Sequence, residues 1–342
     1  MANILVIGGT RNLGHLLVHQ LVRRGDHVTV FNRGKTRDEL PESVERLQGD
    51  RADKTQLAAQ LKGRSFDAVV DTALYKADEA SAITSLLKGR TGHYLFISSG
   101  QVYLVREGAE RPFTESMYAG RTMPAPKSDT YSYEEWLYGM DKRAAEDRLM
   151  EAHVKENFPV TILRLPMVTG ERDHFGRLYG YVLRIKDGGP ILVPATPNFP
   201  LRHVYSGDVV RVMQQLIERR AGIGKAYNIS QDETVTLDEF VGMIGTIMKM
   251  EPAIVRVRRD KLEANGFVPD CSPFSERWMS ELDNTLSKTD LGMRYTPLAD
   301  YLRVTVNHLL ENNPPTPVGY KRRRAELTFY QQVIGQVEVG EP

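Results

Sequence analysis

One cysteine, Cys271, is the only thiol among the 342 residues of the chain. A single thiol excludes an intrachain disulfide and a cysteine-rich metal site, and it is typical of a reducing compartment. The sequence also lacks any run of the roughly 18 apolar residues that a membrane helix needs, and no basic segment precedes its first apolar run as in a secretory signal. We therefore expect a cytoplasmic protein without a membrane span, in which Cys271 is structural or incidental.

An excess of charge of one sign is absent as well. Lys and Arg number 45 and Asp and Glu number 44, so the formal net charge is +1. Nucleic acids and anionic membranes attract basic proteins, and this balance argues against both as partners. Hydrophobic residues make up 41% of the chain, which is typical of a globular protein with a substantial core.

The sequence does contain a regular alternation of short apolar runs and amphipathic segments. A strand pattern over residues 4–7 is followed by a helical pattern over 13–24 and a second strand over 28–31. The alternation continues to a helix over about 134–153 and a strand over 160–163. Strands that alternate with helices predict an α/β fold with a doubly wound parallel sheet, whose ligand crevice lies at the carboxyl ends of its strands.

The turn after the first strand is rich in small residues. A strand that enters a helix through such a turn lets backbone N–H groups approach a pyrophosphate. Arg11 stands where many dinucleotide-binding turns have a middle glycine, and a purely structural turn is the alternative. We expect this turn to contribute the cofactor-binding residues Gly8, Thr10, Arg11, Asn12, Leu13 and Gly14.

The end of the second strand bears on the identity of the cofactor. Asn32 stands where an NAD enzyme normally carries Asp or Glu to bind the ribose hydroxyls, and Arg33 follows it. Without a carboxylate to repel a 2′-phosphate, and with Arg11 and Arg33 available to bind one, NADP is preferred and NAD is the alternative. Two solvated surface arginines would also explain the pattern.

Two further strand ends are expected at the cofactor. Asp50 and Arg51 follow the third strand, where an adenine ring would lie, and Asp50 could accept from the adenine amino group or cap the next turn. Thr72 and Ala73 follow a later strand near the nicotinamide ribose. Their contacts would be mostly through the backbone.

Tyr138 and Lys142 are four residues apart and therefore lie on one face of the predicted helix. A phenol with a pKa of about 10 is a poor acid or base at neutral pH, but a nearby cation favours the phenolate. Upstream, Ser98 and Ser99 end a strand, where a hydroxyl can hydrogen-bond a substrate oxygen on which charge develops. This context favours an active site over a solvated surface pair.

The order of these motifs resembles the extended short-chain dehydrogenase/reductases, the NAD(P)-dependent sugar epimerase/dehydratase family. The likeness covers about residues 2–310 and includes the segments 164–170, 201–210 and 226–230. It implies a Rossmann fold, a tightly held nicotinamide, a small-molecule substrate and often a homodimer. The resemblance also implies that Ser99 is the catalytic hydroxyl, with Tyr138 as the acid/base and Lys142 as its electrostatic partner and a ribose ligand.

Three residues are expected on the substrate side. The resemblance places Arg202 against a substrate phosphate, and Met167 where sugar-nucleotide epimerases usually have an asparagine. Glu115 lies in a long polar connection over 106–133, where it could line the pocket or be solvated. The Gly-Gly-Thr-Arg turn and the Phe-Asn-Arg-Gly segment after the second strand resemble an atypical branch that includes chloroplast stem-loop RNA-binding proteins and bacterial reductases or epimerases.

From Pro166 onward the pattern is less regular. We expect residues 1–165 to form the NADP-binding domain, to which 203–232 return. Residues 166–313 would form mainly a smaller, interleaved C-terminal substrate-binding lobe, and residues 314–342 a C-terminal extension.

The expected function is that of an NAD(P)-dependent oxidoreductase or epimerase, which transfers hydride at a hydroxyl or carbonyl carbon of a small, sugar-like or phosphorylated substrate. A non-catalytic NADP-binding or RNA-binding relative is the alternative, and the run Lys321-Arg322-Arg323-Arg324 is the best argument for RNA. No metal site is expected, because His15 and His19 are four apart on a helix without a suitably spaced carboxylate.

Overall fold

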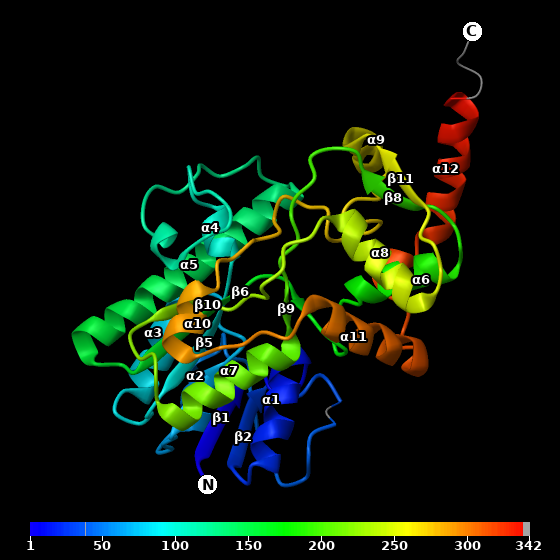
Figure 1. Cartoon of the computed structure of the whole chain (residues 1–342). Coiled ribbons are helices and arrows are strands. Elements are labelled where there is room, and N and C mark those ends of the chain that lie inside the picture. Colours follow the sequence, from blue (N-terminus) through cyan, green and yellow to red (C-terminus); the bar gives the residue numbers. More distant parts are fainter. Residues whose placement is uncertain (38, 338–342) are drawn as a thin grey trace. The chain divides into compact units, whose positions relative to one another are not determined.

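A computed structural model describes residues 1–37 and 39–337 (Figure 1). The chain folds into two compact units and passes between them more than once. The segment 280–295 belongs to the first unit although no sequence feature indicated this. The first unit comprises Met1–Val168, Val204–Ser230 and Ser280–Tyr295, and the second comprises Thr169–His203, Gln231–Met279 and Thr296–Pro342.

A seven-stranded sheet with the order β10-β6-β5-β4-β1-β2-β3 forms the centre of the first unit. All of its neighbouring strands are parallel. The chain order reverses between β1 and β4, which confirms the doubly wound α/β fold and puts the expected ligand crevice at the carboxyl ends of these strands. The strands are β1 (Asn3–Ile7), β2 (His27–Asn32), β3 (Glu45–Gln48), β4 (Ala68–Asp71), β5 (Tyr94–Ser99), β6 (Val160–Leu165) and β10 (Ala226–Asn228).

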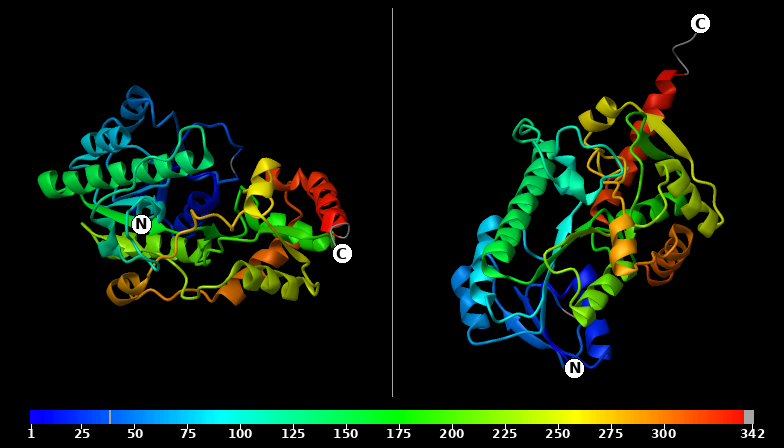
Figure 2. Two further views of the ribbon diagram at one scale, coloured as in Figure 1. Left: turned by 90° about the horizontal axis from the view of Figure 1, so that it is seen from above. Right: turned by 60° about the vertical axis from the view of Figure 1, so that its left-hand side comes forward.

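Both faces of the sheet are covered, because successive side chains of a strand point to opposite faces. Ile4 and Val6 pack with residues of α1 and α7, whereas Leu5 and Ile7 pack with residues of α2, α3 and α5. Figure 2 shows α5 along the outside of the sheet. The helices of this unit are α1 (Asn12–Arg23), α2 (Lys54–Leu61), α3 (Ala77–Leu87), α4 (Gln101–Leu104), η1 (Glu115–Tyr118), α5 (Tyr131–Glu156), α7 (Ser206–Arg219) and α10 (Thr285–Leu291).

Helix α5 is longer than its predicted core of 134–153 because both ends are capped. The Thr130 side chain accepts from the Tyr133 amide at 3.2 Å, which satisfies an N-terminal donor. Asn157 adopts a left-handed conformation with a φ of 55° and ends the helix. The helix therefore extends 26 residues, and both Tyr138 and Lys142 fall in its first half.

The second unit contains elements that the proline-rich sequence obscured. Strands β8 (Ile191–Pro194) and β11 (Ile254–Val257) pair in parallel. Cys271 is buried beside them in an apolar cluster with Leu192 and Phe267, and burial raises the pKa of its thiol to about 12. Such a thiol is unreactive. The helices are α6 (Arg177–Lys186), α8 (Leu237–Met248), α9 (Arg259–Ala264), α11 (Leu298–Asn312), η2 (Val318–Tyr320) and α12 (Arg323–Val337).

Two short strands, β7 (Val168–Thr169) and β9 (Val204–Tyr205), lie where the chain passes between the units. Over residues 1–37 and 39–337, no helix is both long enough and apolar enough to cross a membrane.

Candidate active site

The glycine-rich turn between β1 and α1 is packed so tightly that it admits no larger residue at two positions. Gly8 has a φ of +90°, and a Cβ added there would lie 2.4 Å from Thr72 Oγ1. A Cβ added to Gly14 would lie 2.5 Å from the Gly8 carbonyl oxygen. No side chain caps α1 at Arg11, and its first turn has no acidic residue. The start of α1 thus has the features of a site for a pyrophosphate.

The structure brings Arg11 to the loop that carries Arg33. Arg11 Nη2 donates to Thr36 Oγ1 at 2.9 Å, and both arginines are exposed. Asn32 Oδ1 accepts from the Gly34 amide at 2.7 Å and so stabilises the turn. The structure thus brings Arg11 to the segment 33–37, which follows β2, carries Arg33 and has no acidic residue.

Asp50 and Arg51 lie in different surroundings, although they are adjacent. Asp50 Oδ1 accepts from the Ala52 amide at 3.0 Å, which is the turn-stabilising role considered from the sequence. The Arg51 side chain is buried, donates to Asp71 Oδ2, and donates to Glu79 Oε2 at 3.1 Å. A direct contact of either residue with adenine stays a prediction, whereas the role of Arg51 in a buried ion cluster is a new observation.

Thr72 and Ala73 join the ends of β4 and β1. Thr72 Oγ1 donates to the Ile7 carbonyl at 3.0 Å, and the Ala73 amide donates to Asp71 Oδ1 at 2.9 Å. The segment after β4 is thereby held against the glycine-rich turn, next to Gly8.

Lys142 is almost completely buried on the inner side of α5, with 3% exposure. Its Nζ donates to the Leu74 carbonyl at 2.7 Å and to the Ile97 carbonyl at 3.0 Å. The ammonium also lies 4.6 Å from the ring centroid of Tyr75 and 5.9 Å from that of Tyr138. Burial lowers its pKa from 10.5 to about 8, and nearby carboxylates oppose this effect.

Tyr138 lies one turn before Lys142 and is partly exposed. Gly139 lets this part of α5 approach α4 closely, because a Cβ there would lie 2.9 Å from the Gln101 carbonyl oxygen. Ser99 ends β5, two residues after Ile97, whose carbonyl binds Lys142, and Ser99 Oγ accepts from the Gln101 amide at 3.2 Å. The predicted trio of Ser99, Tyr138 and Lys142 therefore comes from β5 and α5, and Lys142 joins the two elements through the Ile97 carbonyl.

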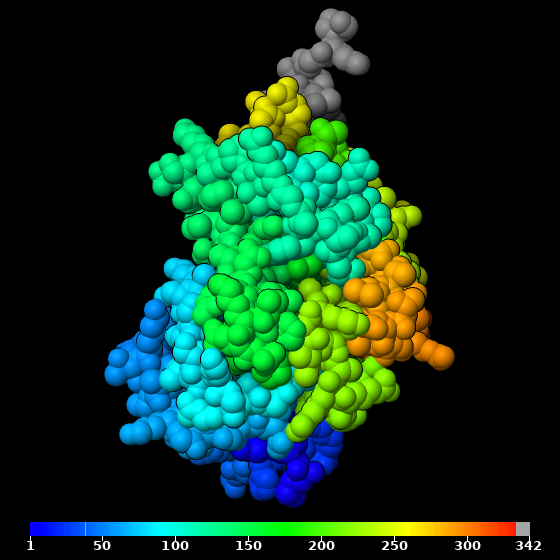
Figure 3. Space-filling model, turned by 90° about the vertical axis from the view of Figure 1, so that its left-hand side faces the viewer, coloured from blue at the N-terminus to red at the C-terminus, as the bar shows by residue number. Residues whose placement is uncertain are grey.

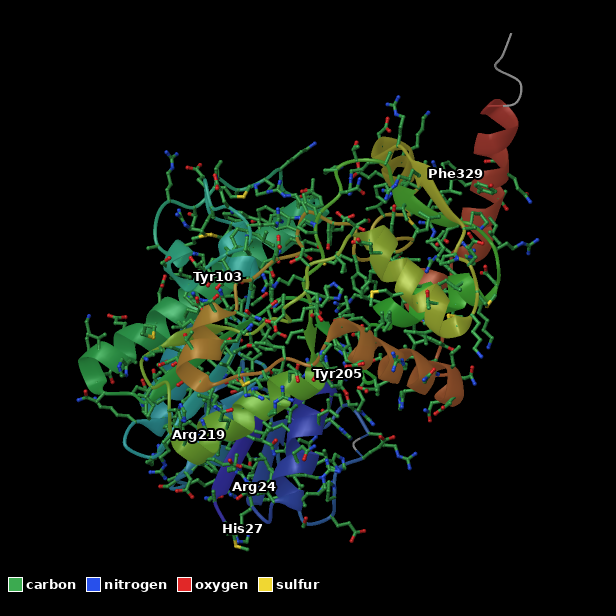
Figure 4. All side chains as sticks on the ribbon, viewed as in Figure 1. Arg24, His27, Tyr103, Tyr205, Arg219 and Phe329 are labelled. Carbon is green, nitrogen blue, oxygen red and sulfur yellow. The ribbon has the colours of Figure 1, made fainter. Side chains whose placement is uncertain are left out.

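A buried polar network behind this trio was missed by the sequence analysis. Ser98 Oγ donates to Glu146, and Arg164 donates to Glu146 Oε2 at 2.6 Å and to the Tyr103 hydroxyl at 2.7 Å. Tyr103, labelled on α4 in Figure 4, donates in turn to Asn228 at 2.8 Å, and burial raises its pKa. The available signal was the spacing of Glu146, four residues beyond Lys142 on the same helix face.

The long connection before α5 packs alongside that helix, and Figure 3 shows the two side by side on one face. Trp136 Nε1 donates to the Met123 carbonyl at 3.2 Å, and Arg143 Nη2 donates to the Tyr118 carbonyl at 2.8 Å. Glu115 Oε1, in η1, accepts from the Asn228 amide at 2.8 Å, and burial raises the pKa of its carboxyl. Glu115 is thus tied to β10.

The other two predicted substrate residues belong to different units. The Met167 carbonyl, in the first unit, accepts from the Val204 amide at 3.0 Å. Arg202, in the second unit, donates from Nε to the Gln231 carbonyl at 2.9 Å. Their contacts with substrate stay predictions.

His15 and His19 contact each other on α1, with 3.2 Å between their Nε2 atoms. Within the described parts of the chain, 1–37 and 39–337, no group of three or more His, Cys, Asp or Glu residues is arranged to hold a metal ion.

The basic run near the C-terminus is partly engaged within the second unit. Arg323 is buried and donates from Nε to Asp187 at 2.7 Å. Arg322 donates from Nη2 to the Asn265 carbonyl at 2.8 Å and lies 4.8 Å from the Phe267 ring centroid. At least two of the four cations therefore serve the packing of α12.

Comparison with known sequences gives a family match over residues 4–230, to the family described as "NAD dependent epimerase/dehydratase family". The chloroplast stem-loop binding protein of 41 kDa b from Arabidopsis thaliana is 34% identical over 114 residues, which are 30% of this chain and 30% of that protein. The 2'-dehydrokanamycin reductase from Streptomyces kanamyceticus is 27% identical over 165 residues, 48% of this chain and 42% of that protein. The matches thus span less than half the length of either relative.

Solved structures share the fold of the chain over about nine tenths of its length. UDP-glucose 4-epimerase from Thermotoga maritima, solved with UDP-glucose, has a TM-score of 0.71 at 19% identity and covers 91% of this chain and 99% of its own. The dTDP-glucose 4,6-dehydratase from Bacillus anthracis, solved with NAD, has a TM-score of 0.70 at 16% identity, with coverages of 92% and 98%. At these identities the likeness establishes the fold.

Proposed function

Because the chain belongs to the NAD dependent epimerase/dehydratase family, we propose that it is an NAD(P)-dependent oxidoreductase or epimerase acting at a hydroxyl or carbonyl carbon of a small, sugar-like substrate. The observation that carries the proposal is the position of Lys142. Its ammonium is buried one helical turn from Tyr138 and is bound to carbonyls next to the ends of β4 and β5. A lysine in such a place serves chemistry better than packing, since burying a cation is costly.

The roles of the trio follow from charge and position. The Lys142 ammonium favours the phenolate of Tyr138, so that the phenol can exchange a proton with a substrate oxygen near neutral pH. Ser99 would donate a hydrogen bond to that oxygen as charge develops on it. The nicotinamide, when bound, supplies or accepts the hydride at the adjacent carbon.

The cofactor preference in this proposal is NADP. The glycine-rich turn fits a dinucleotide pyrophosphate, because no side chain caps the start of α1 and its first turn has no acidic residue, so that its amide groups can bind an anion. Arg11 and Arg33 would bind the 2′-phosphate at the end of β2, where Asn32 offers no repelling charge.

Net reduction of a ketone is the reaction we favour. The Streptomyces relative is named as a reductase of 2'-dehydrokanamycin. Met167 lacks the amide of the asparagine expected in sugar-nucleotide epimerases, which favours a sugar-like substrate without a nucleotide. We also propose a homodimer in the cytoplasm, with Glu115 and Arg202 as substrate contacts to be tested.

An assay of NADPH oxidation with a panel of keto sugars and keto aminocyclitols tests this proposal. Turnover of at least one ketone that disappears on Lys142→Met is expected. Oxidation of NADPH that persists unchanged in this variant would contradict the assignment of the site.

RNA binding is a second candidate, favoured by the match to the Arabidopsis protein, which is named for stem-loop binding. The basic run near the C-terminus provides a weak surface for it, since Arg322 and Arg323 are engaged in packing. Titration of a labelled RNA stem-loop at physiological salt tests it. We expect no saturable binding, whereas tight and salt-sensitive binding would favour this second function.

A further inference from the structure

We propose that Arg51, Asp71 and Glu79 form a positioning cluster for Lys142, which fixes both the carbonyl group that Lys142 binds and the charge that faces it. We call these three residues the Arg51 cluster. The inference rests on the proposed function in giving Lys142 a role in the reaction. Its test, however, does not require turnover.

Three separate elements build the Arg51 cluster. Arg51 follows β3, Asp71 ends β4, and Glu79 lies in the first turn of α3. The Arg51 guanidinium bridges the two carboxylates, and its side chain is 7% exposed while that of Asp71 is fully buried. Tyr94 donates its hydroxyl to Asp71 Oδ2 at 2.7 Å. Buried ions at this density need mutual pairing, because desolvation of each charge is costly.

The two carboxylates hold the backbone on either side of the Leu74 carbonyl. Asp71 Oδ1 accepts from the Ala73 amide at 2.9 Å, and Glu79 Oε2 accepts from the Tyr75 amide at 3.0 Å. The carbonyl between these two fixed amides accepts from Lys142 Nζ at 2.7 Å. A continuous chain of contacts therefore leads from Arg51 through both carboxylates to the ammonium.

The cluster is also unbalanced in charge. Two carboxylates face one guanidinium, so the cluster carries one net negative charge, and Lys142 supplies the balancing positive charge. Other groups around Lys142 include Glu146, which is paired with Arg164, and the rings of Tyr75, Phe96 and Tyr138. The net negative charge of the cluster thus stabilises the ammonium form of Lys142 in its buried position.

The charges around Lys142 act on its pKa in opposite directions. Burial lowers its pKa to about 8, Asp71, Glu146 and Glu79 raise it, and Arg51 lowers it. Removing the charge of Asp71 should therefore lower the pKa of Lys142 further, and removing Arg51 should raise it. A cluster that served packing alone would behave differently. In that case, loss of either Asp71 or Arg51 would open the site to water and move the pKa of Lys142 upward toward 10.5.

The pKa shifts expected in opposite directions distinguish the proposal from a role in packing alone. The full chain is labelled with 13C at the lysine Cε atoms, the signal of Lys142 is assigned with Lys142→Arg, and the signal is titrated by NMR without cofactor or substrate. We expect Asp71→Asn to lower the pKa of Lys142 by about one unit and Arg51→Gln to raise it. If Arg51→Gln does not fold, Glu79→Gln replaces it, with a decrease expected.

The matched control is Glu326→Gln, which removes an equally buried carboxylate paired with Arg184 in the second unit. This variant should leave the titration of Lys142 unchanged. An upward shift of the Lys142 pKa in both Asp71→Asn and the second variant, Arg51→Gln or its replacement Glu79→Gln, would overturn the proposal. The absence of a shift from both variants would also overturn it. If the shifts have the expected signs but no ketone of the panel leads to oxidation of NADPH, the proposed function fails while the positioning cluster stands.

Discussion

The two units of the protein both bury arginine–carboxylate clusters, but the clusters differ in balance. In the second unit Arg184 and Arg323 pair with Glu326 and Asp187, so two cations meet two anions and join α6 to α12. In the first unit Arg51 alone bridges Asp71 and Glu79, and Lys142 lies close enough to be influenced by both. Buried ion pairs are weak evidence for function by themselves. The comparison indicates that an unbalanced cluster beside a titratable amine is the informative feature.

The largest expected effect is a loss of turnover, which distinguishes a catalytic group in the first unit from a group that serves packing alone. Tyr138→Phe should lower turnover by about 10²–10⁴-fold, the usual contribution of a general acid or base, while NADP affinity stays nearly intact. Steady-state kinetics and a cofactor titration measure the two quantities. Tyr320→Phe is the matched control, because it also removes a phenol hydroxyl, one that donates to Asp187 in the second unit. Equal turnover in the two variants would remove Tyr138 from the mechanism.

A pair of buried carboxylates tests the difference between the units. Glu146→Gln in the first unit and Glu326→Gln in the second each break a pair with a buried arginine, so each should lower the free energy of unfolding by about 3 kcal/mol. Urea denaturation measures this loss. Only Glu146→Gln should also change turnover per folded molecule, because Glu146 faces Lys142. An equal loss of turnover in both would show that activity merely follows stability.

A smaller expected effect is the pH dependence of the free energy of unfolding that Lys142 contributes. Its pKa is 10.5 ordinarily and about 8 in the folded protein. Between these values the unfolded state binds more protons than the folded state, so this group makes stability rise with pH across that window and contributes no pH dependence well below it. Urea denaturation at several pH values should show this rise in the wild type and its absence in Lys142→Met. Parallel curves for the two proteins would contradict the buried, charged position of Lys142.

The smallest expected effect concerns the surface beside the glycine-rich turn. Arg33→Ala should weaken NADP binding roughly tenfold through loss of a charge-assisted hydrogen bond, and should leave NAD binding nearly unchanged. Calorimetric titration with both cofactors measures this. Arg219→Ala at the end of α7 removes another exposed arginine of the first unit and serves as the control. Tighter binding of NAD than of NADP by the wild type would refute the preference.

The sheet could be predicted from the sequence because most of its strands are short and apolar. The predicted helix over 13–24 and the predicted strand over 28–31 differ from α1 and β2 by one residue at each end, and the larger error at α5 came from its caps. Strand β8 was missed because prolines surround it and its partner β11 lies 63 positions later in the register of Ile191 and Ile254.

The trio of Ser99, Tyr138 and Lys142 could be predicted because local spacing and the order of the strands can be read from the sequence. The Arg51 cluster had no local signal, since Arg51 is 20 positions from Asp71 and 28 from Glu79. The pair of Arg184 and Glu326 spans 142 positions and was equally invisible. Contacts of this kind depend on the order of strands in the sheet and on long-range packing.

The most direct test of the central claim follows the hydride itself. The protein is incubated with NADPH deuterated at the transferable C4 position and with a ketone that the panel assay identifies, and the product is analysed by mass spectrometry. We predict deuterium on the new carbinol carbon with the wild type and its near disappearance with Tyr138→Phe. Absence of deuterium from the wild-type product, or equal incorporation by Tyr138→Phe, would contradict a redox site built on Tyr138 and Lys142.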